Sequence, residues 1–248
     1  MQFERMIVPQ YRESGADGLI GLKGYMCYCQ DVATWHMHSY NMGNDYLIDN
    51  FGIAWMYAKC RMKIFKKADF SNKLRVETGM TGARKVRVDR DFRITQGGEL
   101  MAVSRLDSCL FNLKEKKLCR LTDIGFEFTE IDEPLDGLEY IRLKRDIIGM
   151  KKVYEYRIRY SDLDKSNHMN NLHYTDLFMN AFGPEFYETH DISEYDINYI
   201  SQGMYGSLLS VYMEQDGDTV YLAAADDEGK ITAAARFRFV TIQRSAGI

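Results

Sequence analysis

A dense group of polar side chains lies where a predicted strand, residues 154–160, gives way to a predicted helix that begins near Asn171. Such a junction collects free backbone N–H groups at the positive end of a helix dipole, which suits a developing oxyanion. A carboxylate and an imidazole a few residues apart can supply the base and the acid of a reaction. The members of the group are Asp162, Asp164, Ser166, Asn167, His168, Asn170 and Asn171.

The same group also has a purely structural interpretation. Asp, Ser and Asn are the residues that turns and helix N-caps prefer, and an isolated His is usually a polar surface residue. Composition alone therefore leaves both interpretations open.

Hydrophobic periodicity predicts one helix ahead of one sheet in the first half of the chain. Apolar residues recur at three- or four-residue spacing over residues 26–41 and stop at Gly43, as in a buried helix. Residues 53–120 have the pattern of long strands joined by polar turns, and the alternation is clearest near residues 85–94. The predicted core face of that strand comprises Val86, Val88, Phe92 and Ile94. Its predicted solvent-exposed face comprises Lys85, Arg87, Asp89, Asp91 and Arg93.

The second half of the chain repeats this plan. A predicted helix over residues 171–182 carries an apolar stripe and ends at Gly183 and Pro184, and strand-like runs follow to Ile242. The sequence therefore predicts the α+β class, with two units that each contain a helix wrapped by an antiparallel sheet.

A short internal similarity supports a duplication. Residues 98–105 resemble residues 229–236, and each segment follows a predicted hairpin turn. Between the two halves, the stretch from Asp123 to Glu139 carries seven acidic residues and no basic one. We therefore expect an N-terminal domain at 1–121, an acidic linker at 122–140 and a C-terminal domain at 141–248.

Composition limits the class of protein. Of 248 residues, 46% are hydrophobic and 27% are charged, which is typical of an ordered globular chain. No run approaches the ~18 apolar residues of a membrane span, and Glu4, Arg5 and Pro9 lie where a signal peptide needs an apolar core. The five scattered cysteines favour reduced thiols in the core over disulfides, zinc sites or a nucleophile. We expect a soluble, cytoplasmic protein with no membrane partner.

The string DLDKSNHMNNLHY, from Asp162 to Tyr174, resembles the signature of acyl-acyl carrier protein thioesterases of the plant and bacterial type. The similarity extends over most of the chain. Members of this family are single chains of two hot-dog domains, so the resemblance implies a double hot-dog fold. It implies hydrolysis of fatty acyl thioesters of acyl carrier protein to the free fatty acid and the carrier protein, with no metal or organic cofactor.

The resemblance also assigns roles to individual residues. Asp164 falls on the family's catalytic carboxylate and His168 on its catalytic histidine, while Asn170 and Asn171 match the pair at the helix start. In the implied mechanism, backbone N–H groups near this pair polarise the thioester carbonyl. Asp164 then attacks it or activates a water, and His168 donates to the departing thiolate or the oxyanion.

Two candidate catalytic positions depart from the family's pattern. Ser166 stands where the family has a catalytic Asn, and Gln202 stands where it usually has a Glu. Gly203 then replaces a frequent Cys. Ser can still donate a hydrogen bond, whereas Gln keeps the shape of Glu but not its charge, so His168 would act mainly as a hydrogen-bond donor.

The resemblance places the acyl chain in the N-terminal domain and the catalytic residues in the C-terminal one. Helix stripes are more often ordinary core, but a few large side chains of the first half are candidates for lining the acyl-chain site. These candidates are Met26, Met37, Tyr40 and Trp55.

Local charge suggests where the acidic carrier protein could bind. Residues 59–93 carry twelve Lys or Arg against four Asp or Glu. The alternative is that these cations are the wet faces of exposed strands. Nucleic acid is a poor partner, because the chain is net acidic and has no recognition motif. The sequence leaves open whether the protein forms a homodimer. Within residues 59–93, the basic cluster expected to contact the carrier protein comprises Arg61, Lys63, Lys66 and Lys67.

Rival functions remain on the same fold. Ser166 and Gln202 suggest an acyl-thioester binding module with weak or lost catalysis, and an acyl-CoA thioesterase is a further alternative. A dehydratase or hydratase would need its own arrangement of a His and an acid, and the string around Asp164 matches the thioesterase pattern better.

Overall fold

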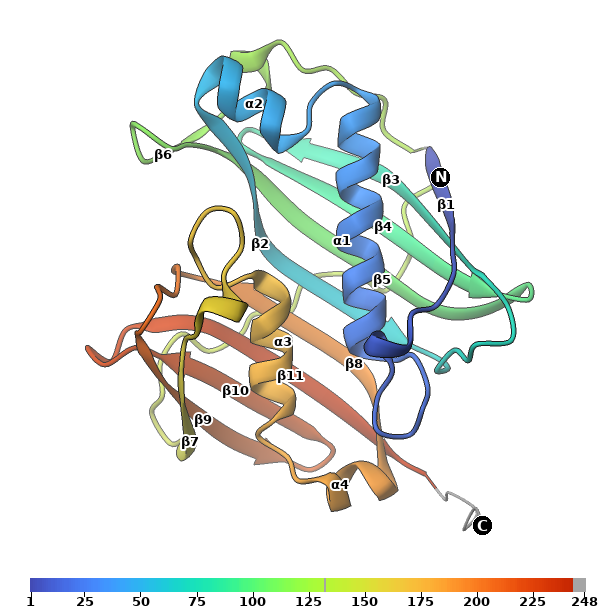
Figure 1. Ribbon diagram of the computed structural model, residues 1–248, viewed down its shortest axis with the longest axis vertical. Helices are drawn as coiled ribbons and strands as arrows, with labels where there is room; N and C mark the ends of the chain where they lie inside the picture. Colours follow the sequence, from blue (N-terminus) through green and yellow to red (C-terminus); the bar gives the residue numbers. More distant parts are fainter. Residues whose placement is uncertain (132, 243–248) are drawn as a thin grey trace. The chain divides into compact units, whose positions relative to one another are not determined.

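The computed structural model describes residues 1–131 and 133–242 of the chain, which divides into two compact units. The first unit is Met1–Glu139, and the second begins at Tyr140. Each unit consists of an antiparallel sheet with helices against it (Figure 1). The expected α+β class is confirmed.

The sheet of the first unit has the strand order β1-β3-β4-β5-β2, and the short β6 also pairs with β5. β4 follows the predicted alternation in part, since Val88, Phe92 and Ile94 are buried. Val86 lies in the turn before the strand and is only partly buried, and Asp91, expected on the solvent face, is 0% exposed because it pairs with Arg105. The strands are β1 (Phe3–Ile7), β2 (Ile53–Ile64), β3 (Leu74–Arg84), β4 (Arg87–Gln96), β5 (Glu99–Asn112) and β6 (Lys117–Cys119).

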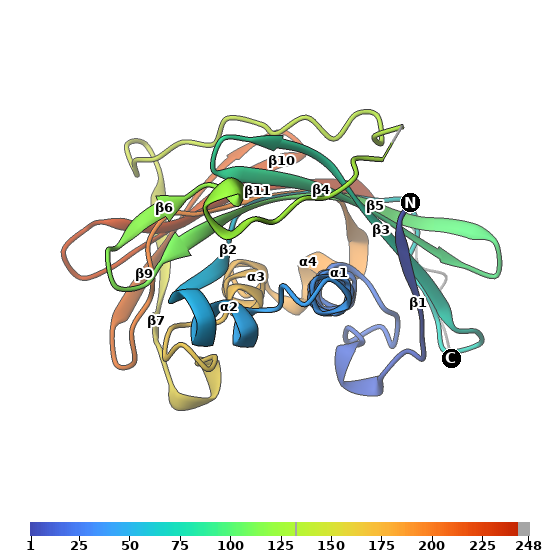
Figure 2. The same ribbon diagram turned by 90° about the horizontal axis from the view of Figure 1, so that it is seen from above.

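Two helices lie on the same face of this sheet (Figure 2). α1 (Leu22–Ser39) is the predicted buried helix, and it begins four residues earlier than expected. α2 (Asn44–Phe51) was not predicted, because Leu47 is its one buried residue and no stripe marks it. Two short 3-10 helices, η1 (Tyr11–Glu13) and η2 (Leu121–Ile124), complete the unit.

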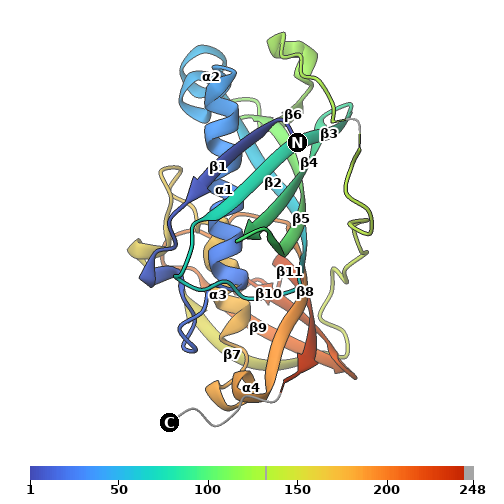
Figure 3. The ribbon, with the colours of Figure 1, turned by 90° about the vertical axis from the view of Figure 1, so that its right-hand side faces the viewer.

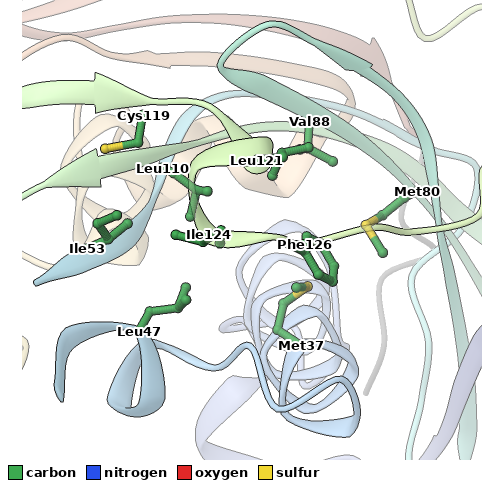
Figure 4. Close-up of a cluster of buried hydrophobic side chains, with 10 residues drawn as sticks. All are labelled: Met37, Leu47, Ile53, Met80, Val88, Leu110, Cys119, Leu121, Ile124 and Phe126. Carbon is green, nitrogen blue, oxygen red and sulfur yellow. The ribbon is translucent and has the colours of Figure 1, made fainter. Parts of the chain in front are cut away.

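Most of the segment expected as a linker, 122–140, belongs to this first unit. Ile124 and Phe126 pack with Met37 in a buried cluster at one end of α1 (Figure 4). Further along, the segment crosses the face opposite to α1 (Figure 3). There the N–H of Leu135 donates to Asp91 Oδ2 at 2.7 Å.

The second unit has the strand order β8-β11-β10-β9-β7. α3 (Asn171–Met179) is the predicted second helix, and it buries Tyr174, Leu177 and Phe178. It ends before Gly183, and a separate short helix, α4 (Pro184–Thr189), begins at Pro184. The other elements are β7 (Lys151–Arg157), η3 (Tyr160–Asp162), β8 (His190–Tyr199), β9 (Leu208–Asp216), β10 (Thr219–Ala225) and β11 (Ile231–Thr241).

The two units have the same connectivity. In each, one strand precedes a 3-10 helix, a long or central helix, a short helix and four consecutive strands. The strand orders are also equivalent, since β1 to β5 occupy in their sheet the places that β7 to β11 occupy in theirs. Gly98 and Gly229, at φ of 87° and 78°, start equivalent strands. The predicted duplication therefore extends to the whole topology.

Candidate active site

The polar residues that the sequence analysis predicts to carry the chemistry form a short hairpin between η3 and α3. The N–H of Asp164 donates to the carbonyl oxygen of His168 at 2.9 Å, and the N–H of Asn167 donates to that of Asp164 at 3.0 Å. Asn167 has a φ of 59°, a left-handed conformation that Asn tolerates in tight turns. The Asp164 carboxylate accepts the N–H of Ser166 at 2.8 Å, which holds the turn. The backbones of Asp164 and His168 are therefore direct neighbours.

The segment that follows β8 fixes the position of this hairpin. His168 forms an antiparallel bridge with Met204, and the N–H of Met169 donates to the carbonyl oxygen of Gly203 at 2.9 Å. Gln202, the candidate farthest away in sequence, directly precedes these partners. The predicted catalytic residues on these two adjoining segments are Asp164, Ser166 and Gln202, which are exposed, and His168, which is partly buried.

Asp162 is the buried anchor of the hairpin, a role that the sequence pattern did not distinguish. The residue is 5% exposed, and its Oδ2 accepts the Tyr156 hydroxyl and the N–H of Arg159, both at 2.7 Å. Its carbonyl oxygen accepts the N–H of Asn170 at 2.8 Å. Burial, followed by the bond to Asp162, raises the pKa of Tyr156 to about 12, so its hydroxyl stays a donor at neutral pH. Asp162 thus ties β7 and η3 to the start of α3.

The first turn of α3 leaves one backbone donor unused. Asn170 is the N-cap, and its side-chain oxygen accepts the N–H of Leu172 at 3.0 Å. The N–H of Asn170 donates to Asp162, and that of His173 donates to the Asn170 carbonyl at 2.9 Å. Among the residues that the structure describes, the N–H of Asn171 has no acceptor. Of the predicted pair, Asn171 therefore has the N–H that can donate to an oxyanion.

Gly203 permits close packing behind the hairpin. A methyl group at this position would lie 2.6 Å from Ile158 Cδ1 and 2.9 Å from Tyr174 Oη. Both neighbours are buried, and the Tyr174 hydroxyl has no hydrogen-bond partner among residues 1–131 and 133–242. Burial also raises the pKa of Tyr174. A side chain at position 203 would therefore clash with buried atoms.

We expect Gly203→Ala to lower the free energy of unfolding by about 1–3 kcal/mol, because buried neighbours must shift. Turnover of the expected thioester substrates should fall as well, since the Gly203 carbonyl accepts the N–H of Met169, the residue after His168. Urea unfolding measures the first effect and thiol release the second. Gly82→Ala is the matched control: no atom lies within 4 Å of a methyl group added to this strand glycine, so stability should change little. Equal stability of the two variants would contradict tight packing at Gly203.

The first unit contains a loop with the same backbone hydrogen bonds as the Asp164 hairpin. This loop lacks side chains that could act as an acid or a base. The N–H of Gly15 donates to the carbonyl of Leu19 at 2.8 Å, and that of Gly18 donates to Gly15 at 3.0 Å. Gly18 has a left-handed φ of 73°. Gly15 and Leu19 thus occupy the places that Asp164 and His168 have in the second unit. Neither side chain can transfer a proton.

Three of the four residues expected to line an acyl-chain site lie together in the first unit. The ring centroids of Tyr40 and Trp55 lie 5.7 Å and 6.2 Å from that of Phe126. Met37 belongs to the same cluster, in which Figure 4 shows it facing Phe126. Met26 is buried about three turns earlier on α1. The structure therefore separates Met26 from the other three.

The basic cluster expected to bind a carrier protein is not a continuous surface of unpaired charge. Arg61 is 7% exposed. Lys66 pairs with Glu99 at 2.8 Å, and Lys67 pairs with Asp17 at the same distance. The arrangement favours the alternative interpretation, in which these cations belong to the alternating faces of the strands.

In the part of the chain that is described, no group of three or more His, Cys, Asp or Glu side chains is placed to hold a metal ion. None of its helices is both long enough and apolar enough to cross a membrane. All five cysteines are unpaired by disulfides, and burial raises the pKa of Cys29 and Cys109, which makes poor nucleophiles of these thiols.

Comparisons with known proteins agree with both halves of the chain. Residues 2–131 match the acyl-ACP thioesterase N-terminal domain, and residues 147–240 match the acyl-ACP thioesterase C-terminal domain. The chain is 24% identical, over 204 residues and 75% of its length, to the chloroplastic acyl-[acyl-carrier-protein] hydrolase FATB2 of Cuphea viscosissima. It spans about half, 48%, of the length of that curated relative.

Solved structures share the fold over nearly the whole chain. An acyl-ACP thioesterase from Bacteroides thetaiotaomicron aligns with a TM-score of 0.86 at 17% identity, covering 96% of this chain and 97% of that one. The 12:0-ACP thioesterase from Umbellularia californica aligns with a TM-score of 0.81 at 18% identity, covering 97% of each chain. The expected double hot-dog fold is confirmed. The two domain matches together show that this chain belongs to the acyl-ACP thioesterase family.

Proposed function

We propose that this protein hydrolyses fatty acyl thioesters of acyl carrier protein, releasing the free fatty acid and the carrier protein. The matches to both family domains support this activity, as does the name of the curated relative, an acyl-carrier-protein hydrolase. The observation that supports the proposal is the hairpin in which the N–H of Asp164 donates to the carbonyl oxygen of His168, three residues before the unused N–H of Asn171.

The proposed reaction begins at the thioester carbonyl carbon. Asp164 attacks this carbon or takes a proton from an attacking water, and the carbonyl oxygen becomes an oxyanion. The N–H of Asn171 donates to the oxyanion at the positive end of α3. The tetrahedral intermediate then collapses and the C–S bond breaks. The proton that Asp164 took from the water passes through His168 to the departing thiolate, with the imidazole accepting at one nitrogen as it donates from the other. If Asp164 attacks directly, a water molecule then cleaves the acyl-Asp164 anhydride, which releases the fatty acid and supplies the proton for the thiolate.

Two further residues position these groups. The N–H of Ser166 holds the Asp164 carboxylate at 2.8 Å. Gln202 lies beside the segment that pairs with His168, where its amide can hydrogen-bond the imidazole. Because Gln202 is neutral, it cannot stabilise an imidazolium as a carboxylate would, so His168 starts the cycle as a hydrogen-bond donor.

A second candidate function is the binding of acyl thioesters with weak or absent turnover. The exposed, neutral Gln202 favours it, because the site lacks the second carboxylate that would charge the imidazole. Such a protein would bind the acyl carrier and release it unchanged.

Matched acyl thioesters of carrier protein and of CoA separate these candidates. We expect the purified protein to release free thiol from carrier-protein thioesters well above the background rate, and more slowly from CoA thioesters of the same chain. The carrier protein without an acyl group is the control. Faster turnover of the CoA series would assign an acyl-CoA thioesterase, and tight binding without thiol release would assign a binding module.

A further inference from the structure

An exposed rim lies beside the candidate active site in the second unit. Ile158 donates its N–H to the carbonyl oxygen of Ser207, and its own carbonyl oxygen accepts the N–H of Gly206, both at 3.0 Å. The other edge of residues 203–207 pairs with the hairpin, so this segment lies between residues 157–160 and the hairpin. We call the surface of these two segments the hairpin rim.

The hairpin rim presents large side chains to solvent. Tyr160 is 84% exposed, Tyr205 is 67% exposed and Met204 is 49% exposed. Arg157 and Arg159 are also exposed. Tyr, Met and Arg are enriched at protein–protein interfaces, where Tyr and Arg supply much of the binding energy. The rim therefore has the composition of an interaction surface.

The charge of the hairpin rim is positive. Neither Arg157 nor Arg159 forms an ion pair with a carboxylate of the described residues, and Arg157 donates instead to the carbonyl oxygen of Gly206 at 2.8 Å. The one acid of β7, Glu155, pairs with Lys152, and the rim itself contains no Asp or Glu. Two guanidinium groups without a carboxylate partner on an exposed surface attract an acidic partner.

Both units carry exposed aromatic residues at this place. Tyr11 and Tyr160 each begin a 3-10 helix, and they are 83% and 84% exposed. Phe70 lies six residues after the end of β2, and Tyr205 lies six residues after the end of β8. In the first unit the ring centroids of Tyr11 and Phe70 lie 6.1 Å apart. The duplication of the fold therefore accounts for the aromatic part of the rim.

The two arginines have no charged counterpart in the first unit. Gln10 stands in the place of Arg159, since each precedes its 3-10 helix and donates its N–H to the acid at the end of that helix. Two residues earlier, Val8 stands in the place of Arg157. Both counterparts are neutral, so the fold requires no cation at either position. The positive charge occurs in the unit that carries Asp164, which indicates a role in the handling of the substrate.

We propose that the hairpin rim binds the acidic surface of acyl carrier protein, with Arg157 and Arg159 facing its carboxylates and Tyr160 and Tyr205 packing against it. This inference rests on the proposed thioester hydrolysis and names the surface that holds the protein part of the substrate. The acyl group is joined to the carrier protein by a flexible arm, so a carrier protein bound at the rim delivers the thioester to the adjacent hairpin.

A double substitution, Arg157→Gln with Arg159→Gln, tests this surface. For wild type and variant, kcat/KM is measured on one acyl group joined to carrier protein, to phosphopantetheine and to pantetheine. We expect the value for the carrier-protein thioester to fall by about fivefold or more at low ionic strength, because two exposed charge pairs are lost. The values for the two small thioesters should stay unchanged. The fall should nearly vanish in ~1 M salt, where the Debye length is about 3 Å.

Arg145→Gln with Lys151→Gln is the matched control. Both residues are exposed, and Lys151 lies at the opposite end of β7 from Arg157, about 20 Å away, so the same charge is lost away from the rim. This variant should keep the wild-type kcat/KM on every thioester. The duplication supplies a second matched pair: Tyr160→Ala should lower kcat/KM for the carrier-protein thioester about fivefold, whereas Tyr11→Ala should leave it unchanged.

Several outcomes would overturn the inference. An equal loss on the pantetheine thioester would mean that the arginines act on the reaction itself. An equal loss on the phosphopantetheine thioester would assign them to the phosphate of the arm and not to the protein. An unchanged value for the carrier-protein thioester, or the same fall in the control variant, would show that the rim does not hold the carrier protein.

Binding keeps this test separate from the test of hydrolysis. If no thioester is hydrolysed, the proposed function fails, and calorimetry still tests the rim, with carrier protein that bears its acyl group through an amide in place of the thioester. Weaker binding by the arginine variant than by wild type supports the inference, and equal binding overturns it. If the double variant does not fold, because Arg157 also holds Gly206, Arg159→Gln alone decides by the same measurements.

Discussion

Asp164→Asn should lower the turnover of acyl thioesters by about a hundredfold or more while the fold persists. Asn keeps an oxygen that can accept the N–H of Ser166, which the Asp164 carboxylate accepts at 2.8 Å, so the hairpin survives. The substitution removes the negative charge needed for attack or proton abstraction. Thiol-release kinetics should show a large fall in kcat and a smaller change in KM, because the substrate still binds.

Asp226→Asn is the matched control for this result. Asp226 also accepts backbone N–H groups in a tight turn of the second unit, from Glu228 at 3.1 Å and from Lys230 at 2.8 Å. It loses the same charge without touching the hairpin, so kcat should stay at the parent value. If Asp164→Asn hydrolyses thioesters at the parent rate with an unaltered melting temperature, the hairpin only caps a helix.

Asp162→Ala should destabilise the protein by about 2–4 kcal/mol and abolish most turnover. The substitution leaves the Tyr156 hydroxyl and the N–H of Arg159 without the acceptor that both use at 2.7 Å. Both hydrogen bonds are partly buried and have a charged acceptor, so the loss of each costs about 1–3 kcal/mol. The Asp162 carbonyl still accepts the N–H of Asn170, but η3 loses its side-chain cap and its bond to β7, which displaces the hairpin. Urea unfolding and thiol release measure the two effects.

Asp162→Asn separates the hydrogen bonds from the charge. Its side-chain oxygen can accept the same two donors, so we expect most of the stability and turnover to return. A role as catalytic acid or base would predict the opposite, namely a stable Asn variant without turnover. Full stability of Asp162→Ala would show that the buried carboxylate anchors nothing.

Periodicity predicted the elements that bury one continuous face. The sequence predicted α1, α3 and the strand-rich region 53–120, which contains β2 to β5. It missed α2 and α4, because one buries a single residue and the other none. It also missed β1, whose five residues are exposed or partly exposed and show no alternation. Short edge elements take their structure from contacts that a local pattern does not contain.

The candidate site was predictable where it is local in sequence. The hairpin joins residues four apart, so their types and spacing indicated the chemistry. The ion pairs of Lys66 and Lys67 join residues 33 and 50 positions apart, so a count of local charge could not detect them.

The loop around Gly15 bears on the ancestry and the stoichiometry of the molecule. Its backbone hydrogen bonds repeat those of the Asp164 hairpin, which extends the duplication of the fold to this loop. A pair of identical half-length chains would carry the proposed Asp and His pair twice, whereas this chain carries it once. The proposed mechanism therefore predicts one reacting acyl group per chain.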